Sequence, residues 1–249
     1  MEKGVDARSS LESPTCALVP FSFRSPFHDA LRDRTRWFPI AGKRIRIDQA
    51  WQSDGRGGTT LGFGASVYDA AIALSLYLAA HRELVQGKQI LELGGGPGLV
   101  GVVAAHFEPE RVVITDGDPA SVALTRRNIE LNGLAESVCR AEKYLWGDVD
   151  HALVPEVGGR GQYDLILGAD IVACPYASAF EALMTSLQAL AGPETLVLLA
   201  YKKRMHSEAK FFATFDNVFD TETIDRSEMH PDFQEEDDIV IFRARLKTQ

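Results

Sequence analysis

Short apolar runs alternate with longer segments of helical spacing through the middle of the chain. Short runs bounded by turn residues are typical of buried strands, and here they lie at residues 88–93, 111–115, 163–170 and 195–201. Apolar positions three and four residues apart predict the intervening helices, at residues 98–107, 119–132 and 180–190. Strands separated by helices of this length predict a parallel sheet covered on both faces, a doubly wound α/β domain.

Weaker patterns extend this arrangement at both ends of the chain. Residues 43–49 alternate between apolar and charged side chains, which predicts a half-exposed strand, and residues 67–81 carry an apolar helical stripe. A third strand of the central series is expected within residues 141–148. Near the C-terminus, residues 220–224 and 239–246 are predicted strands close enough to pair in antiparallel fashion.

The N-terminal region differs from the rest of the chain. Residues 1–40 contain many Ser, Pro and Arg residues without sustained periodicity, so we expect a poorly ordered arm there. The remaining residues, 41–249, have the length of one domain and show no internal repeat.

The strongest local signal lies between residues 88 and 101. A buried strand ends at Leu93, and four glycines precede the next helix, at positions 94, 95, 96 and 98. A strand that turns this tightly into a helix needs residues without Cβ, because the backbone visits positive φ and approaches a ligand closely. The following strand ends in Asp116, where such sheets place a carboxylate that binds the ribose of a nucleotide. The sequence therefore predicts a nucleoside-cofactor site.

Two cofactors are compatible with this pattern, because Gly-x-Gly-x-x-Gly over residues 96–101 is also found in NAD-binding folds. Three features favour S-adenosylmethionine. Glu92 at the strand end would repel a pyrophosphate but suits an ammonium and a sulfonium. Residues 1–87 precede this strand, whereas dehydrogenases usually begin close to it. Trp146 offers an aromatic face for an adenine ring.

Several motifs together resemble those of the seven-β-strand protein-lysine methyltransferases, the group that includes enzymes modifying chaperones, elongation factors and calmodulin. The similarity covers about residues 43 to 246. It is carried by the segments 64–71, 91–101, 115–116, 128–132, 145–148 and 163–170. The resemblance implies a Rossmann-like seven-stranded sheet, mostly parallel with a C-terminal antiparallel hairpin. It also implies transfer of a methyl group from S-adenosylmethionine to a lysine side chain of another protein.

The same resemblance assigns roles to individual residues. The glycine loop would wrap the methionine part of the cofactor, through Gly94, Gly96 and Gly98. Asp116 would hold the ribose, and Trp146 would line the adenine site. Ala169 and Asp170 would border the methionine end and the substrate channel.

Two positions depart from the family pattern. Tyr68 stands where the family often has a Trp before the first core helix, which leaves a smaller face for stacking on the cofactor. The family commonly shows Asp-x-x-Tyr after the fourth strand, where this chain has Ala173 in place of the Tyr. Tyr176 could compensate from a shifted loop, or the substrate could differ.

Methyl transfer from a sulfonium is an in-line displacement that depends on positioning and on a neutral amine. Asp170 is our candidate for orienting that amine, and Tyr201 could line the substrate opening. Each assignment has a structural alternative. Asp170 could cap a turn, Trp146 could be an ordinary core residue, and Glu92 could accept hydrogen bonds from nearby backbone N–H groups.

Composition and charge restrict the partners and the compartment. A net charge of −9 and a pI near 5.2 argue against a nucleic-acid surface, which relies on clustered Lys and Arg. The three cysteines are scattered, so we expect reduced thiols in a cytoplasmic or nuclear protein. No apolar run reaches the length of about eighteen residues that a membrane span needs, and the N-terminus lacks a secretory signal. The six histidines show no ligand-like spacing, so no metal is expected.

Other functions stay open at this point. A methyltransferase for a small molecule or RNA could use the same fold, and a non-catalytic cofactor-binding module is a third possibility. An NAD-dependent oxidoreductase is disfavoured because neither a substrate domain nor a Tyr-x-x-x-Lys helix is present in the sequence. The oligomeric state is not specified by the pattern.

Overall fold

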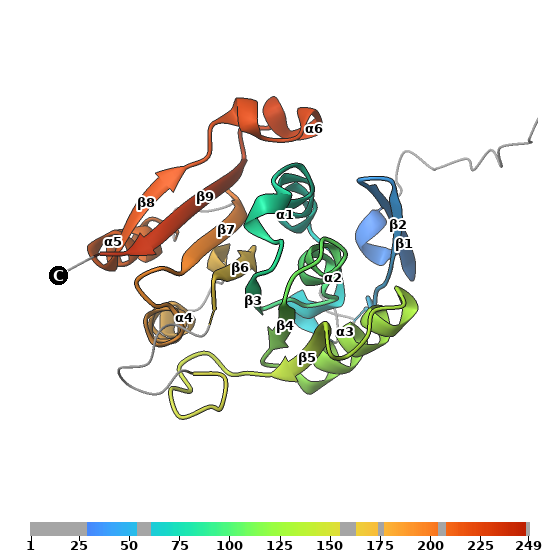
Figure 1. Cartoon of the computed structure of the whole chain (residues 1–249), viewed down its shortest axis with the longest axis horizontal. Helices are drawn as coiled ribbons and strands as arrows, with labels where there is room; N and C mark the ends of the chain where they lie inside the picture. The colour runs from blue at the N-terminus through green and yellow to red at the C-terminus, as the bar shows by residue number, and fades with distance from the viewer. Residues whose placement is uncertain (1–28, 54–60, 155–162, 174–176, 204–207, 248–249) are drawn as a thin grey trace, which may run out of the picture.

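The computed structural model describes residues 29–53, 61–154, 163–173, 177–203 and 208–247. Its centre is a seven-stranded sheet with the strand order β5-β4-β3-β6-β7-β9-β8 (Figure 1). The strands of this sheet are β3 (Gln89–Leu93), β4 (Arg111–Asp116), β5 (Cys139–Lys143), β6 (Leu165–Ala169), β7 (Leu196–Lys202), β8 (Phe219–Thr223) and β9 (Ile239–Leu246). The predicted doubly wound α/β sheet is therefore confirmed.

β5, β4, β3, β6 and β7 pair in parallel, and only β9 runs in the opposite direction. β3 pairs with β4 on one side and with β6 on the other, so the chain reverses its direction of strand addition at β3. β9 inserts between β7 and β8 and is antiparallel to both. Because ligands of doubly wound sheets bind at such a reversal point, beyond the carboxyl ends of the strands, the topology places the site above β3, β4 and β6.

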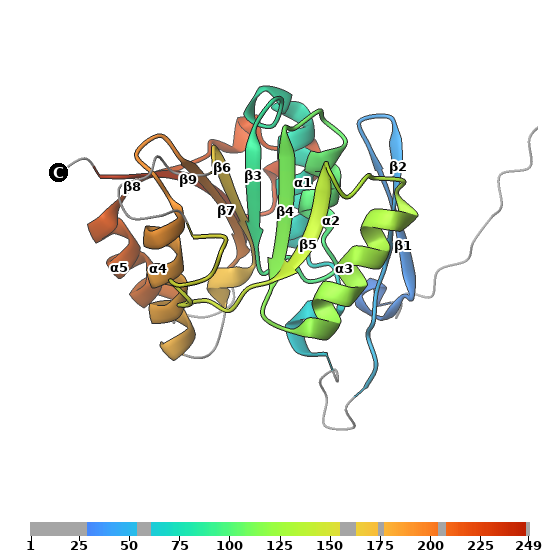
Figure 2. The same cartoon turned by 60° about the horizontal axis from the view of Figure 1, so that its bottom comes forward.

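Helices cover both faces of the sheet (Figure 2). The first hydrophobic cluster joins one face of the sheet to α1 (Asp69–Ala80), α2 (Leu99–Ala105) and α3 (Pro119–Leu131). The second cluster joins the other face to α4 (Ala177–Leu190) and α5 (Glu208–Val218). Short helical turns complete the described chain: η1 (Ala30–Arg32), η2 (Gly62–Ala65), η3 (Arg82–Leu84), η4 (Ile171–Ala173), η5 (Arg226–Glu228) and α6 (Pro231–Gln234). Within the described ranges, none of these helices is both long and apolar enough to cross a bilayer.

The expected N-terminal arm is wrong in its last part. A two-stranded hairpin, β1 (Thr35–Ile40) and β2 (Lys43–Asp48), packs against the domain, and β1 lies inside the range assigned to the arm. Phe38 and Ile40 of β1 are buried, so this strand does alternate between inward and outward side chains. Pro39 is tolerated because β1 is an edge strand. Residues 1–28 lie outside the described part of the chain.

Two local expectations bear on the site. α3 begins at residue 119, as predicted. Pro119 lies in its first turn, and the Asp118 side chain caps it by accepting a hydrogen bond from the Ala120 N–H, at 2.6 Å. The third central strand, expected within residues 141–148, starts at Cys139 and ends at Lys143. Residues 144–148 therefore leave the sheet as a loop, and this loop carries Trp146 to the cavity described next.

Candidate active site

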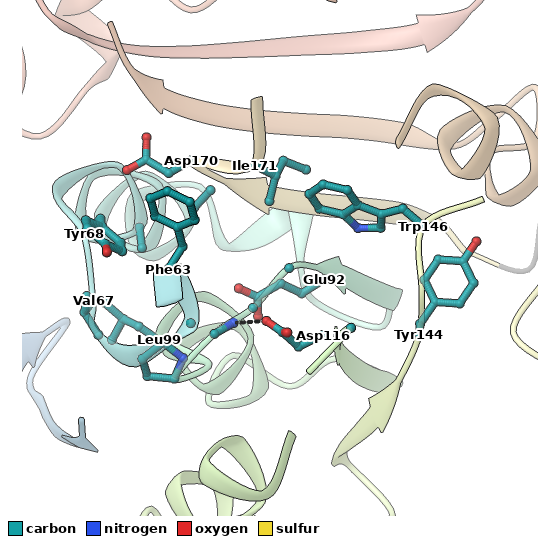
Figure 3. Close-up of a pocket in the computed structure, with 18 of the residues that line it drawn as sticks. Phe63, Val67, Tyr68, Glu92, Leu99, Asp116, Tyr144, Trp146, Asp170 and Ile171 are labelled. Carbon is teal, nitrogen blue, oxygen red and sulfur yellow. Dashed lines mark hydrogen bonds between the residues drawn. The ribbon is translucent and has the colours of Figure 1, made fainter. Parts of the chain in front are cut away.

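A cavity of about 510 Å³ lies at the carboxyl ends of β3, β4 and β6 (Figure 3). Its volume falls within the range of about 300–1,000 Å³ that is typical of small-ligand sites. Eight of the nine predicted site residues line it, namely Tyr68, Glu92, Gly94, Gly96, Asp116, Trp146, Ala169 and Asp170. Gly98 is the exception, since it lies at the start of α2 and does not line the cavity.

The glycine loop forms one wall through its backbone. Gly94, Gly96 and Gly98 have φ values of 63°, 54° and 86°, in the left-handed region that favours glycine. The Gly95 N–H donates to the Thr115 carbonyl at 2.8 Å, and the Thr125 hydroxyl donates to the Gly96 carbonyl at 2.6 Å. These bonds fix the loop to β4 and α3.

Side chains at the loop glycines would collide with both sides of the site. A Cβ on Gly94 would lie 2.7 Å from Cγ2 of Ile171 and 3.3 Å from Cζ2 of Trp146. A Cβ on Gly98 would lie 2.6 Å from Cγ2 of Thr125. Gly94 therefore keeps the cavity open, whereas Gly98 allows α2 and α3 to pack closely.

Asp116 connects the end of β4 to the glycine loop. Its Oδ2 accepts a hydrogen bond from the Gly96 N–H at 3.0 Å, and its Oδ1 accepts from the Asp118 N–H at 2.9 Å. Burial raises the pKa of this carboxyl above its usual value, against the opposing effect of these backbone N–H groups. The side chain thus holds the loop and lines the cavity at the position expected for ribose binding.

Glu92 lies deeper than its predicted role requires. Its side chain is 2% exposed, and its Oε2 accepts a hydrogen bond from the Gly101 N–H at 2.8 Å. Burial raises the pKa of Glu92 to about 8, so this carboxyl is mostly protonated at neutral pH. Glu92 therefore has a structural role, because it accepts a hydrogen bond from a backbone N–H. Its side chain also lines the cavity.

The loop after β5 forms the aromatic side of the cavity. Trp146 is half-buried and packs with the hydrophobic cluster that includes Ile171. Ser186 of α4 anchors this loop, because its Oγ accepts the Gly147 N–H at 2.8 Å and lies 2.9 Å from the Tyr144 hydroxyl. The hydrogen bonds that Tyr144 and Gly147 make to Ser186 therefore hold the loop that places Trp146 at the cavity.

Asp170 stands directly after β6 in a strained backbone conformation. Its φ of 59° is in the left-handed region, which is uncommon for a residue other than glycine. Its N–H donates to the Ala200 carbonyl at 2.8 Å, and its Oδ1 accepts from the Lys202 N–H at 2.9 Å. Both partners belong to β7, so the end of that strand fixes the Asp170 carboxylate at the cavity.

An ion-pair group lies beside Asp170. The Lys202 Nζ is 2.9 Å from Oδ2 of Asp69, in the first turn of α1, and 3.3 Å from Oδ2 of Asp238, just before β9. Hydrogen bonding to Asp69 raises the pKa of Lys202, so its ammonium stays charged. This group links α1, β7 and β9 at the edge of the sheet that carries Asp170.

Phe63 is a site residue that the sequence analysis missed. It lies in η2, is 68% exposed, and lines the same cavity as Tyr68 and Asp170 (Figure 3). The next residue, Gly64, packs so closely on α3 that a Cβ there would lie 2.2 Å from the Ser121 hydroxyl oxygen. An aromatic residue between two glycines, just before the predicted helix, was the available signal.

Two further expectations from the sequence have different outcomes. Tyr201 does not open onto the cavity; it is buried against Phe212 and Phe242, so the expectation that it lines the substrate opening is wrong. Tyr176, considered as a replacement for the missing aromatic residue, lies outside the described residues.

The groups around the cavity fit the parts of S-adenosylmethionine. A backbone loop at positive φ accommodates close approach by a ligand, and Asp116 offers carboxylate oxygens at the end of β4. Trp146 and Leu145 supply an apolar and aromatic wall suited to a purine. The opposite end, at Ala169 and Asp170, combines an apolar strand end with a carboxylate.

Comparisons with known proteins agree with this assignment. The model of a family described as lysine methyltransferase matches residues 50–218. The chain is 35% identical over 232 residues to protein N-lysine methyltransferase METTL21A of Danio rerio, covering 92% of this chain and 95% of that protein. It is 32% identical over 206 residues to EEF1A lysine methyltransferase 3 of Mus musculus, covering 83% and 81%.

Solved structures add support for the fold. The crystal structure of a ribosomal protein L11 methylase from Lactobacillus delbrueckii subsp. bulgaricus superposes with a TM-score of 0.50 at 16% identity. The match covers 73% of this chain and 81% of that one. The family model and the two relatives, not the solved structure, show that the chain belongs to the lysine methyltransferase family and transfers methyl groups from S-adenosylmethionine to lysine side chains of protein substrates.

Proposed function

We propose that the two ends of the cavity divide the work of this methyltransferase, one holding the cofactor and the other presenting the substrate lysine. On the cofactor side, Gly94 and Gly96 contact the methionine part, Asp116 binds the ribose and Trp146 lines the adenine site. Tyr68 borders the cofactor from the N-terminus of α1. Gly98 acts indirectly, because it shapes the turn into α2 without lining the cavity.

Asp170 receives the lysine amine in this proposal. The observation that carries the assignment is its strained, left-handed backbone at the cavity, held by two hydrogen bonds from or to β7. Such strain persists only where the surrounding structure enforces it, and it is concentrated at functional sites. The fixed carboxylate accepts a hydrogen bond from the incoming amine and so aligns its lone pair with the methyl group.

The apolar walls around Asp170 favour a neutral amine. When bound, S-adenosylmethionine supplies an electrophilic methyl group on a sulfonium, which only an unprotonated lysine can attack. Phe63, Ile171 and Ala169 line the cavity together with Asp170 and contribute apolar surface. Desolvation disfavours the charged form of an amine, so these walls lower the cost of presenting the lysine in its neutral form.

Charge and thiol chemistry support a proposal for the partner and the compartment. We propose that the partner is a protein and not a nucleic acid, on the basis of the net charge of −9. A cytoplasmic or nuclear location is supported by Cys139, a buried free thiol of β5.

The test follows methyl-labelled S-adenosylmethionine into a cell lysate treated with the purified protein. Labelled protein is hydrolysed to amino acids, and nucleic-acid and small-molecule fractions are counted separately. We expect label in methyl-lysine, reduced about a hundredfold or more by Asp170→Ala because the amine is then misplaced. Asp237→Ala, at an exposed acid outside the cavity, is the matched control.

Two results would contradict the proposal. Wild-type rates for Asp170→Ala would show that this carboxylate does not orient the lysine. Label confined to RNA or to small molecules would show that the chain acts on a different substrate class.

A further inference from the structure

The β1–β2 hairpin has two chemically different faces. Its inner face is apolar and packs into the domain, with Phe38, Ile40, Ile45 and Ile47 all buried. Its other face carries Trp37, Pro39, Arg44 and Arg46, which are exposed or half-exposed. Together with Arg127 of the neighbouring α3, these four residues are called the outer face below.

The outer face presents an aromatic ring between two guanidinium groups. Trp37 is 51% exposed, and in the strand register it lies directly opposite Arg46. The Cζ of Arg44 lies 4.6 Å from the centroid of the Trp37 ring, and the Cζ of Arg46 lies 5.9 Å away. These stacks hold the ring and the charges in fixed relative positions.

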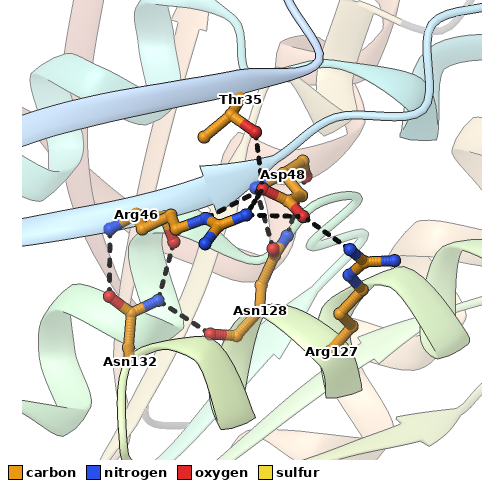
Figure 4. A network of polar contacts seen from close by, with 6 residues as sticks. All are labelled: Thr35, Arg46, Asp48, Arg127, Asn128 and Asn132. Carbon is orange, nitrogen blue, oxygen red and sulfur yellow. Dashed lines mark hydrogen bonds and ion pairs between the residues drawn. The ribbon is translucent and has the colours of Figure 1, made fainter.

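Asp48 orients two of the arginines (Figure 4). Its carboxylate is 3.1 Å from the guanidinium of Arg46 and 3.2 Å from that of Arg127, and it accepts the Thr35 hydroxyl at 2.7 Å. Burial acts to raise the pKa of Asp48, but the hydrogen bonds from Thr35 and Arg46 and the arginine charges hold it below its usual value. Two guanidinium groups thus gather around one carboxylate, and Arg127 remains 65% exposed.

The hairpin is rigidly joined to the cavity wall. The Val67 N–H donates to Oε1 of Gln49, just after β2, at 2.8 Å. The Val67 carbonyl accepts a hydrogen bond from Arg36 of β1, also at 2.8 Å. Because Val67 lines the cavity beside Tyr68, a partner bound to the hairpin would be held at a fixed position relative to the site.

We propose that the outer face is a docking surface for an acidic segment of the protein substrate. The enzyme modifies proteins, so recognition of the substrate also involves the protein surface outside the cavity. Guanidinium groups pair with carboxylates through two parallel hydrogen bonds, and exposed Trp and Arg residues supply much of the binding energy of protein interfaces. The chain has a net charge of −9, so a local basic face favours one docking position for an acidic partner.

This inference rests on the protein substrate of the reaction and is independent of the role given to Asp170. A direct binding measurement therefore separates the two proposals. Failure of docking at the outer face would leave the role of Asp170 unaffected, and failure of the role of Asp170 would leave docking unaffected.

The experiment titrates the full-length protein with a fluorescently labelled oligo-glutamate peptide and follows anisotropy. We expect saturable binding that weakens with added salt and drops about tenfold or more in Arg44→Glu and in Trp37→Ala. The matched control is Arg82→Glu, because Arg82 also stacks on an aromatic ring, with its Cζ 4.8 Å from the centroid of Phe107, but outside the hairpin. S-adenosylmethionine affinity, measured on each variant, verifies that the fold is intact.

Two outcomes would overturn the proposal. Equal peptide affinity for the wild type, Arg44→Glu and Arg82→Glu would show that the outer face does not capture acidic segments. Tighter binding of an RNA oligonucleotide than of the peptide, lost in Arg44→Glu, would assign the face to nucleic acid instead.

Discussion

The cofactor side and the substrate side of the cavity are built in different ways. On the cofactor side, one strand, the glycine loop and the next helix follow each other within residues 89–105, and Asp116 joins from the adjacent strand. On the substrate side, Phe63, Asp170 and Lys202 come from segments far apart in the sequence and meet only in the folded domain. The first side is determined by backbone sterics, and the second by tertiary packing.

This difference predicts where substitutions change function. The glycine loop can vary little, because Gly94, Gly96 and Gly98 occupy left-handed conformations. In addition, a Cβ on Gly94, Gly95 or Gly98 would collide with a neighbouring side chain. The substrate side depends on side chains, which can be exchanged without breaking the turn that carries them. Relatives could therefore keep one cofactor while changing the protein they modify.

The largest expected effect is that of Gly94→Ala, because this residue lies where the two sides meet. The new Cβ would lie 2.7 Å from Ile171 and 3.3 Å from Trp146, and the residue would keep a φ of 63°. We expect affinity for S-adenosylmethionine, measured by calorimetry, to fall about a hundredfold as the loop shifts out of position.

Gly133→Ala is the matched control for this change. Gly133 has a φ of 66°, yet nothing lies within 4 Å of a Cβ built there. Both variants pay a similar backbone cost of about 1 kcal/mol, so only the contact differs. Equal cofactor affinity in the two variants would contradict this. It would show that the contacts of a Cβ at position 94 with Ile171 and Trp146 do not affect cofactor binding.

A smaller effect is expected from Glu92→Gln, which removes the ionisable group buried on the cofactor side. The pKa of Glu92 is about 8 in the folded chain and lower when unfolded, so between these values the unfolded state releases a proton that the folded state keeps. The free energy of unfolding of the wild type should therefore fall as pH rises toward 8, by up to about 1.4 kcal/mol per pH unit from this group.

Glutamine keeps an oxygen for the Gly101 N–H but cannot ionise. Denaturant unfolding across this pH range should give a flatter profile for the variant than for the wild type. Parallel profiles would mean that Glu92 does not titrate in this window and that its carboxyl is ionised in the folded protein.

The sequence predicted the cofactor side well, for a physical reason. Glycines at positive φ, a capping Asp before a Pro, and a carboxylate at a strand end are local requirements that appear as local residue types. Gly94, Gly96 and Asp116 are accordingly found at the cavity. Gly98 shows the limit of this reasoning, because the pattern identifies a tight turn but not which of its glycines faces the ligand.

The substrate side and the hairpin were predicted less completely. Phe63 lies between two glycines, which indicate a tight turn, but the sequence does not show that this turn packs on α3 through Gly64 and Ser121. The second strand of the hairpin was predicted, but β1 was missed because Pro39 and the many arginines masked its alternation. Tyr201 was misplaced since a strand end can face either the cavity or a helix, and α5 covers it through Phe212.

The most direct test of the division between the two sides compares S-adenosylmethionine affinity in Asp116→Asn and Asp170→Asn by calorimetry. Asn preserves side-chain size at both positions, and thermal unfolding verifies that each variant is folded. The account predicts that Asp116→Asn weakens the affinity about tenfold or more, through loss of charge-assisted hydrogen bonds, while Asp170→Asn leaves it unchanged and impairs only transfer to lysine. An equal loss of affinity in both variants would contradict it, because Asp170 would then belong to the cofactor site.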